Sequence, residues 1–220
     1  MPTKFTVRIE NITKADAFTA SNGVKWSLGF SPGVAVVHTE KSAVFTLGKK
    51  DRGKGLEAQS EEGDPGMLAK SLGGGKGIKS VTLFNTPLAG SVPGPITPGA
   101  GYEFTLFGTP GDRLSLTTMM GQSNDWFYGP AESGIALFKN GKPISGDVTS
   151  QIILWDAGTE VNQEPGIGAD QGPRQKAANT GNAENGVVRN VKDVEFGSAY
   201  TKVSSVMRVT ITPAQTSGAN

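Results

Sequence analysis

The sequence predicts an all-β sandwich, in which antiparallel strands are joined by many short turns. Glycine and proline are abundant, at 31 and 13 residues, while hydrophobic residues make up only 36% of the 220-residue chain. This composition is typical of many turns and not of a helical bundle. Apolar and polar residues alternate along several segments, which is the pattern of half-buried antiparallel strands. The length is sufficient for one large sandwich with a substantial core.

The strands are assigned from this alternation. It is cleanest over residues 5–12 and returns at 102–107, at 113–120 and at 207–211. The sequence GTPGD joins the second and third of these segments and contains a Pro-Gly turn, so we expect them to pair as a hairpin. Their number and spacing, with those of the further candidates, favour a sandwich. The further strand candidates are 34–38, 43–47, 79–84, 135–138 and 148–155.

One short helical excursion interrupts the strands. Asp64 can cap the helix, Pro65 suits its first position and Gly73 ends it. Its expected apolar stripe consists of Met67, Leu68 and Leu72. A short turn at 56–59 is expected to pack beside it. The run GGGKG at 73–77 does not fit a phosphate-binding loop, because glycine follows the lysine and a helix precedes the run where a strand is required. We interpret it as a flexible exit from the helix.

Residues 161–186 differ in kind from the rest of the chain. They are polar, rich in Gly and Pro and almost without apolar anchors, which predicts a long surface loop of functional or mobile character. No repeat or linker divides the chain, so we expect one domain over 1–212 and a disordered tail over 213–220. The opening MPTKFTVRIE shows no signal-peptide pattern. The protein is therefore expected either to be intracellular or to have lost an export signal.

Charge and composition exclude several classes of function. The 21 Lys and Arg residues balance the 20 Asp and Glu residues, so no overall field attracts nucleic acid or an anionic membrane, and either partner would need a local patch. We expect no nucleic-acid partner. The absence of cysteine and the single histidine, His38, exclude thiolate and multi-histidine metal sites. His38 lies in the apolar stretch VAVVHTE, where a packed or rim position is favoured over a catalytic one, and no pattern identifies an enzyme.

Two loops carry acidic residues next to tryptophan, each just after an expected strand. Asp125 lies in SNDWFYG, and Asp156 and Glu160 lie in LWDAGTE, where the small residues between them allow a tight bend. Calcium takes six to eight oxygen ligands at about 2.3–2.6 Å, so these three carboxylates would make a partial shell. The alternative is that both aspartates form Asx turns that end their strands. The spacing alone favours that alternative.

These motifs resemble the spondin domain, the N-terminal module of F-spondin and mindin. The resemblance is carried by DRLSLTTMMGQSNDWFYG at 112–129, DAGTE at 156–160 and VMRVTIT at 206–212, and extends over nearly the whole chain. It implies a C2-like antiparallel β-sandwich with calcium at one end, held by Asp125, Asp156 and Glu160. The chain departs from animal members in having no cysteine and in having glutamate where mindin-type domains have aspartate as the third ligand. We also expect it to lack the accompanying modules of the animal proteins.

The resemblance further implies an extracellular or cell-surface domain that acts in adhesion or matrix assembly without catalysis. Its partner is expected to be an unidentified extracellular protein or glycan, and the sequence leaves the oligomeric state open. One alternative is a C2-like module that binds membrane surfaces through calcium, with Trp126 and Phe127 inserted at the interface. The other is a carbohydrate-active enzyme that uses acidic residues at the same end.

Overall fold

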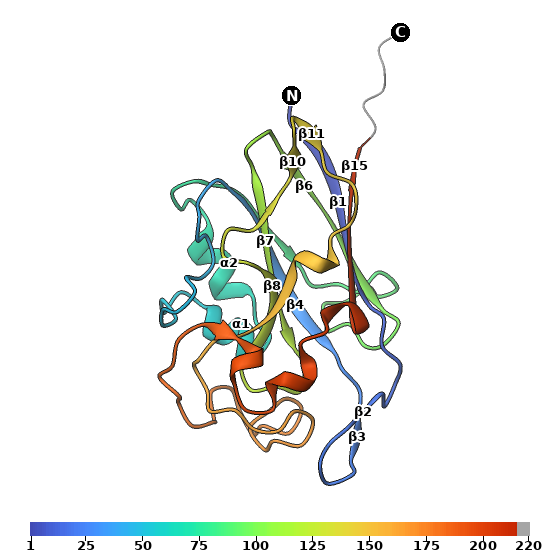
Figure 1. The fold of residues 1–220 in the computed structure, drawn as a ribbon, viewed down its shortest axis with the longest axis vertical. Helices are drawn as coiled ribbons and strands as arrows, with labels where there is room; N and C mark the ends of the chain where they lie inside the picture. Colours follow the sequence, from blue (N-terminus) through green and yellow to red (C-terminus); the bar gives the residue numbers. More distant parts are fainter. Residues whose placement is uncertain (215–220) are drawn as a thin grey trace.

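The computed structural model describes residues 1–214 and has the predicted all-β sandwich with a short helical excursion (Figure 1). The first sheet consists of β1 (Thr3–Asn11), β6 (Gly101–Gly108), β12 (Gly146–Asp147) and β15 (Met207–Pro213). The second consists of β4 (Phe30–His38), β5 (Ile78–Phe84), β7 (Arg113–Met120), β8 (Trp126–Pro130), β9 (Ile135–Ala136), β13 (Ile152–Asp156) and β14 (Arg189–Asn190). All named pairs in both sheets are antiparallel.

The strand order places the long loop at one end of the sandwich. The first sheet runs β12-β15-β1-β6, and the second runs β14-β13-β8-β7-β4-β5 with β9 beside β7. The segment between β13 and β14, coloured orange, lies at the end opposite the N-terminus (Figure 1). The helices are α1 (Leu56–Glu61) and α2 (Gly66–Leu72), and two-stranded ribbons join β2 (Phe18–Thr19) to β3 (Lys25–Trp26) and β10 (Phe138–Lys139) to β11 (Lys142–Pro143). Short 3-10 helices span Thr149–Gln151, Val191–Asp193, Gly197–Tyr200 and Val203–Ser205.

The main core lies between the two sheets, as the alternation predicts. Phe5, Val7 and Ile9 of β1 are fully buried, while the residues between them are partly or fully exposed. Across the core, the Phe84 ring of β5 stacks on the Phe104 ring of β6 with centroids 4.9 Å apart. Each buried aliphatic or aromatic side chain of this size stabilises the fold by about 1.5–3 kcal/mol relative to an exposed one.

A second core lies on the outer face of the larger sheet. Strand β4 does not alternate in burial, because Val34 and Val36 pack outward against the helical layer while Ala35 and Val37 face the first sheet. Leu68 and Leu72 of α2 contribute to this outer cluster, as expected, but Met67 is 60% exposed. Burial on both faces explains why VAVV is a continuous apolar run. The two helices are needed because they cover the outer face of this strand.

The predicted hairpin between 102–107 and 113–120 is wrong. Strand β6 pairs with β1, whereas β7 pairs with β4, β8 and β9, so the two strands belong to different sheets. The turn between them is closed by Asp112, whose Oδ2 accepts from the backbone N–H and the hydroxyl of Thr109. A short Pro-Gly turn can join paired strands or cross between the layers of a sandwich. Here the apolar face of β6 is turned toward the other sheet.

Two other sequence predictions need correction. Residues 43–47 form no strand, although Ala43, Val44 and Phe45 are buried, because the carbonyls of Ser42 and Ala43 accept from the Arg52 guanidinium and pair with no neighbouring strand. Pro65 lies at the N-cap position of α2 and Asp64 one residue earlier, where its Oδ1 accepts from the Gly66 N–H at 2.8 Å. Strand β15 extends to Pro213. The remainder of the predicted tail, 215–220, lies outside the described residues.

Candidate metal centre

Strand pairing brings Asp125 and Asp156 together. Asp125 lies in a loop, as the sequence predicts, and is the last residue of the connection between β7 and β8, which begins at Trp126. Asp156 is the last residue of β13 and is paired directly with Trp126 across the sheet. Both aspartates are fully buried at the same end of adjacent strands. The prediction that the two loops converge is therefore matched by the geometry.

Glu184 is the third carboxylate of the cluster. One oxygen each of Asp125, Asp156 and Glu184 lies within 4.8 Å of the other two. Glu184 lies near the end of the long loop and is held by Arg189, whose Nη2 donates to its Oε1. Arg189 lies directly opposite Asp156 in the β13–β14 pairing, with its Nε 3.4 Å from Asp156 Oδ1. Sequence reasoning missed Glu184, because nothing in the composition of the loop distinguishes it.

The cluster contains buried oxygen atoms that lack hydrogen bonds. Asp125 Oδ2 accepts from the N–H of Thr159 at 2.7 Å and of Glu160 at 3.2 Å, and Asp156 Oδ2 accepts from Asn162 Nδ2 at 2.6 Å. Among the described residues of this cluster and its neighbour Asn162, four further buried oxygens have no hydrogen-bond donor: Asp125 Oδ1, Asn162 Oδ1, Glu184 Oε2 and Asp156 Oδ1, the last of which lies 3.4 Å from Arg189 Nε. Each buried polar atom without a partner costs about 1–3 kcal/mol, and more when it is charged. Such atoms call for a cation or for protons.

The two aspartates of the cluster have shifted pKa values. Burial raises the pKa of Asp125 well above its usual value, and the neighbouring Asp156 raises it further. Burial also raises the pKa of Asp156, against the lowering effects of the Asn162 hydrogen bond and the Arg189 charge. When all three carboxylates are ionised, they and the Arg189 guanidinium carry two net negative charges, which a divalent ion would neutralise. Because all the free ligand atoms are oxygens of Asp, Glu and Asn, the residues fit a hard cation such as calcium.

Glu160, predicted from the resemblance as the third ligand, occupies a different place. It contributes its backbone N–H to Asp125 Oδ2, while its carboxylate is absent from the cluster and faces Gly181, where a Cβ would lie 1.3 Å from Oε1. A bridge between Glu160 and Ala183 fixes this orientation. Burial raises the pKa of the Glu160 carboxyl to about 7. The tight bend was expected to bring the Glu160 carboxylate back toward Asp156. Instead, it brings the Glu160 backbone N–H to Asp125 Oδ2.

Glu61, near Glu160, gives the protein a predicted pH dependence. The residue is 4% exposed, and burial, reinforced by the charge of Glu160, raises its pKa from 4.5 to about 7. Because the folded-state pKa is the higher one, the stabilising effect of the proton is fully present below the unfolded pKa and is lost as the pH rises through about 7. Glu61→Gln should therefore stabilise the protein at about pH 8 by on the order of 2 kcal/mol, but not at about pH 4.

Urea unfolding of the wild type and Glu61→Gln across this pH range measures the difference. A difference in unfolding free energy that does not change with pH would show that the side chain matters only for packing.

The aromatic residues beside the aspartates belong to the two cores. Trp126, Phe127, Tyr128 and Trp155 are all at most 4% exposed, so none is available for a membrane or a partner. This removes the insertion of Trp126 and Phe127 on which the membrane alternative depended. His38 is also fully buried, with Nδ1 2.8 Å from the Glu40 carbonyl and Nε2 2.9 Å from Ser115 Oγ. Its packed position matches the expectation for a lone histidine in an apolar strand.

The long loop is held by an amide network next to the carboxylates. Gln171 is fully buried, donates to Asn124 Oδ1 at 2.9 Å and accepts from the backbone N–H groups of Gly166 and Gly168. Asn124 Oδ1 also accepts from the Gln163 N–H. The residue immediately before Asp125 therefore holds the first half of the loop. This order was not expected from the composition of the loop, which indicated a surface segment of functional or mobile character.

Comparisons of the chain with known protein-family models and with curated protein sequences gave no match. The spondin resemblance therefore rests on the motifs in the sequence. Over residues 1–214, the structure has no helix that is both long enough and apolar enough to cross a membrane.

Proposed function

We propose that the chain is a non-catalytic, calcium-binding β-sandwich of the extracellular adhesion or matrix type. The observation that carries the calcium part is the group of four buried oxygens without hydrogen-bond donors around Asp125, Asp156 and Glu184. The resemblance of the SNDWF and DAGTE motifs to the spondin domain supports the same ion, the extracellular or cell-surface location and the adhesive role. We propose an extracellular protein or a glycan as the partner of the chain.

The chain's own residues prepare the site in distinct ways. Thr159 and Glu160 fix one oxygen of Asp125 through backbone N–H groups and leave the other free. Asn162 does the same for Asp156 and brings an amide oxygen of its own. Calcium would neutralise the excess negative charge and join both ends of the long loop to β8. Since few ligands come from the protein, water or a partner's oxygens would complete the shell.

Two glutamate variants test the proposal, one inside the carboxylate cluster and one outside it. Calorimetric titration of chelator-treated protein should give a saturable calcium affinity that Glu184→Gln lowers by about tenfold or more, because a charged ligand is lost. Glu160→Gln is the matched control, because its carboxylate lies outside the cluster, and it should change the affinity by less than about threefold. Equal losses in the two variants would contradict the assignment of Glu184. No calcium binding by the wild type would refute the site.

A further inference from the structure

A basic surface lies next to the helices, away from the carboxylate cluster. Residues 40–54 and 66–79 contain eight of the 21 Lys and Arg residues but two of the 20 Asp and Glu residues, and the four acidic residues of the intervening segment reduce the net charge of residues 40–79 to +2. Of the eight, Lys79 is paired with Asp112 at 2.6 Å. The other seven form no ion pair with any residue in the part of the chain that the structure describes. Within that part of the chain, none of these seven cations is therefore neutralised by a direct ion pair.

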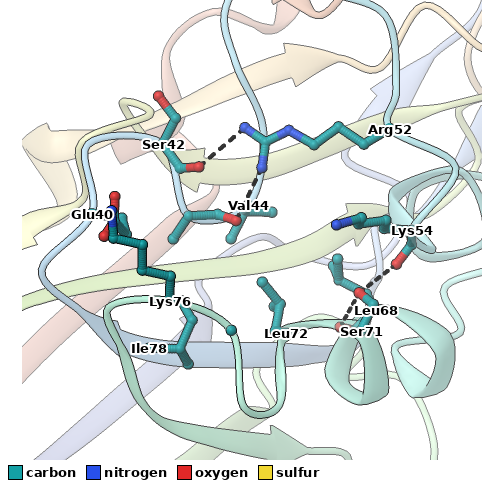
Figure 2. A pocket seen from close by; sticks show the side chains of 12 residues that line it. Glu40, Ser42, Val44, Arg52, Lys54, Leu68, Ser71, Leu72, Lys76 and Ile78 are labelled. Carbon is teal, nitrogen blue, oxygen red and sulfur yellow. Dashed lines mark hydrogen bonds between the residues drawn. The ribbon is translucent and has the colours of Figure 1, made fainter.

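A hollow of about 240 Å³ lies within this surface (Figure 2). Arg52, Lys54 and Lys76 lie at its rim, with Glu40 as the single acidic residue, and the carboxylates of α1 are not among the lining residues. Its other walls are mainly aliphatic, although Ser42, Ser71 and Gly75 also line the hollow. The aliphatic walls are formed by Ala43, Val44, Leu68, Leu72 and Ile78. Figure 2 shows Arg52 across one side, Lys54 on a second and Lys76 beside Glu40 on a third, around Leu72 and Ile78.

The rim is held in place by hydrogen bonds to uncharged carbonyl and hydroxyl oxygens, which do not neutralise its cations. The Arg52 guanidinium donates to the carbonyl oxygens of Ser42 at 3.0 Å and Ala43 at 3.2 Å, and to Thr46 Oγ1 at 2.6 Å. These bonds hold the cation in place and leave N–H donors for a ligand, because a guanidinium has five. Ser71 Oγ donates to the Lys54 carbonyl at 2.7 Å and so ties the second cation to α2.

Gly55 allows the Lys54 segment to lie this close to α2. Its φ is +99°, and a Cβ at this position would lie 2.4 Å from the backbone nitrogen of Leu68. A side chain would therefore push the segment away from the helix and open the hollow. The turn over 73–77, which has no phosphate-binding pattern, brings Lys76 to the opposite side. Chain segments on both sides thus position cations around an aliphatic floor.

We infer that this hollow binds a small amphipathic anion, a carboxylate, sulfate or phosphate group joined to a short aliphatic body. The three cations at the rim outnumber the single carboxylate of Glu40 and match the anionic group, and the aliphatic floor matches an apolar body. The volume is below the range of about 300–1,000 Å³ that is usual for drug-sized ligands. It has room for about eight groups the size of a water molecule, so a short alkyl chain fits. This inference is independent of calcium.

Butyl phosphate is a suitable probe, and inorganic phosphate and butylammonium are its controls. Titration followed by NMR should shift the signals of Lys54, Leu72, Lys76 and Ile78 to saturation with butyl phosphate. Inorganic phosphate should bind about tenfold more weakly because it lacks the apolar body, and butylammonium should not bind. Salt should weaken binding, because exposed charges are screened. Equal binding of inorganic and butyl phosphate, or no saturable shift with butyl phosphate, would overturn the inference.

Two double variants of exposed lysines distinguish binding in this hollow from a general effect of surface charge. Lys54→Gln combined with Lys76→Gln should lower the affinity for butyl phosphate by about tenfold or more. Lys139→Gln combined with Lys142→Gln removes the same charge from the β10–β11 ribbon and should leave it unchanged. Unaltered binding in the first pair would refute the site. Pelleting with phosphatidylserine vesicles in the absence of butyl phosphate binding would assign the surface to lipid headgroups on a membrane and overturn the inference of a small ligand.

Discussion

Calcium added to metal-free protein is expected to raise the melting temperature by roughly 5–10 °C. An ion that binds only the folded state stabilises it by about 2.7 kcal/mol at a hundredfold excess over its dissociation constant. For a domain of this size, each kcal/mol shifts the melting temperature by about 2–4 °C. Scanning calorimetry with calcium and with chelator measures the difference. Asp125→Asn and Asp156→Asn should each remove most of it, because each replaces a charged ligand with little change in shape.

Asp112→Asn is the matched control for these two variants. Asp112 is likewise a buried aspartate, at 2% exposed, but it pairs with Lys79 outside the cluster. The Asp112→Asn substitution should destabilise the protein without altering the difference in melting temperature between calcium and chelator. Asp125→Asn should also leave the metal-free protein at least as stable as the wild type, because it removes a buried charge beside Asp156. A calcium effect that persists in both ligand variants would place the ion elsewhere.

Trp126→Ala is expected to lower the free energy of unfolding by about 3–5 kcal/mol, the usual cost of removing a large buried aromatic side chain. Trp126 is fully buried in the main core, with its ring 5.7 Å from that of Tyr200. Urea unfolding gives the value, and Trp126→Phe, which should lose less, keeps the test open if the alanine variant does not fold. Phe107→Ala, at a side chain that is 58% exposed, should change stability by less than about 0.5 kcal/mol.

The two results have different meanings for function. A small loss in Trp126→Ala would mean that the indole is free at the surface, as the membrane alternative requires. A large loss would mean that any partner must bind elsewhere, because the neighbouring aromatic residues are equally buried.

How far the sequence predicts this fold depends on what each pattern measures. Alternation reports one buried face, so β1 and β15 were found, as were the two sides of β6. It does not report which strand lies alongside, and the predicted pairing of β6 with β7 was therefore wrong. The apolar run at 43–45 is buried like a strand, but its carbonyls bind Arg52. A helical layer outside the sheet produces burial that no periodicity reveals.

The candidate site was predicted in part for a similar reason. Asp125 and Asp156 each lie next to a strand end, and strand ends that are adjacent in a sheet meet. Glu184 is separated from both by most of the long loop, and it is brought back by the pairing of Arg189 with Asp156 and by the bridge between Glu160 and Ala183. The one local signal available was an acidic residue a few positions before a basic one at the point where the chain returns to the sheet. Nothing in the DAGTE motif reveals that Glu160 contributes its backbone and not its carboxylate.

The position of Asp156 and Glu184 at the two ends of one loop makes the protein suited to display foreign peptides. Much of 172–180 is exposed, while both anchors of the loop belong to the cluster, and Asp156 also belongs to the β13–β14 pair. An epitope inserted there would begin and end at fixed points of a rigid support, because flexible loops tolerate added length at small entropic cost. A calcium-dependent clasp at the base would then hold the epitope in one shape, and a chelator would release it.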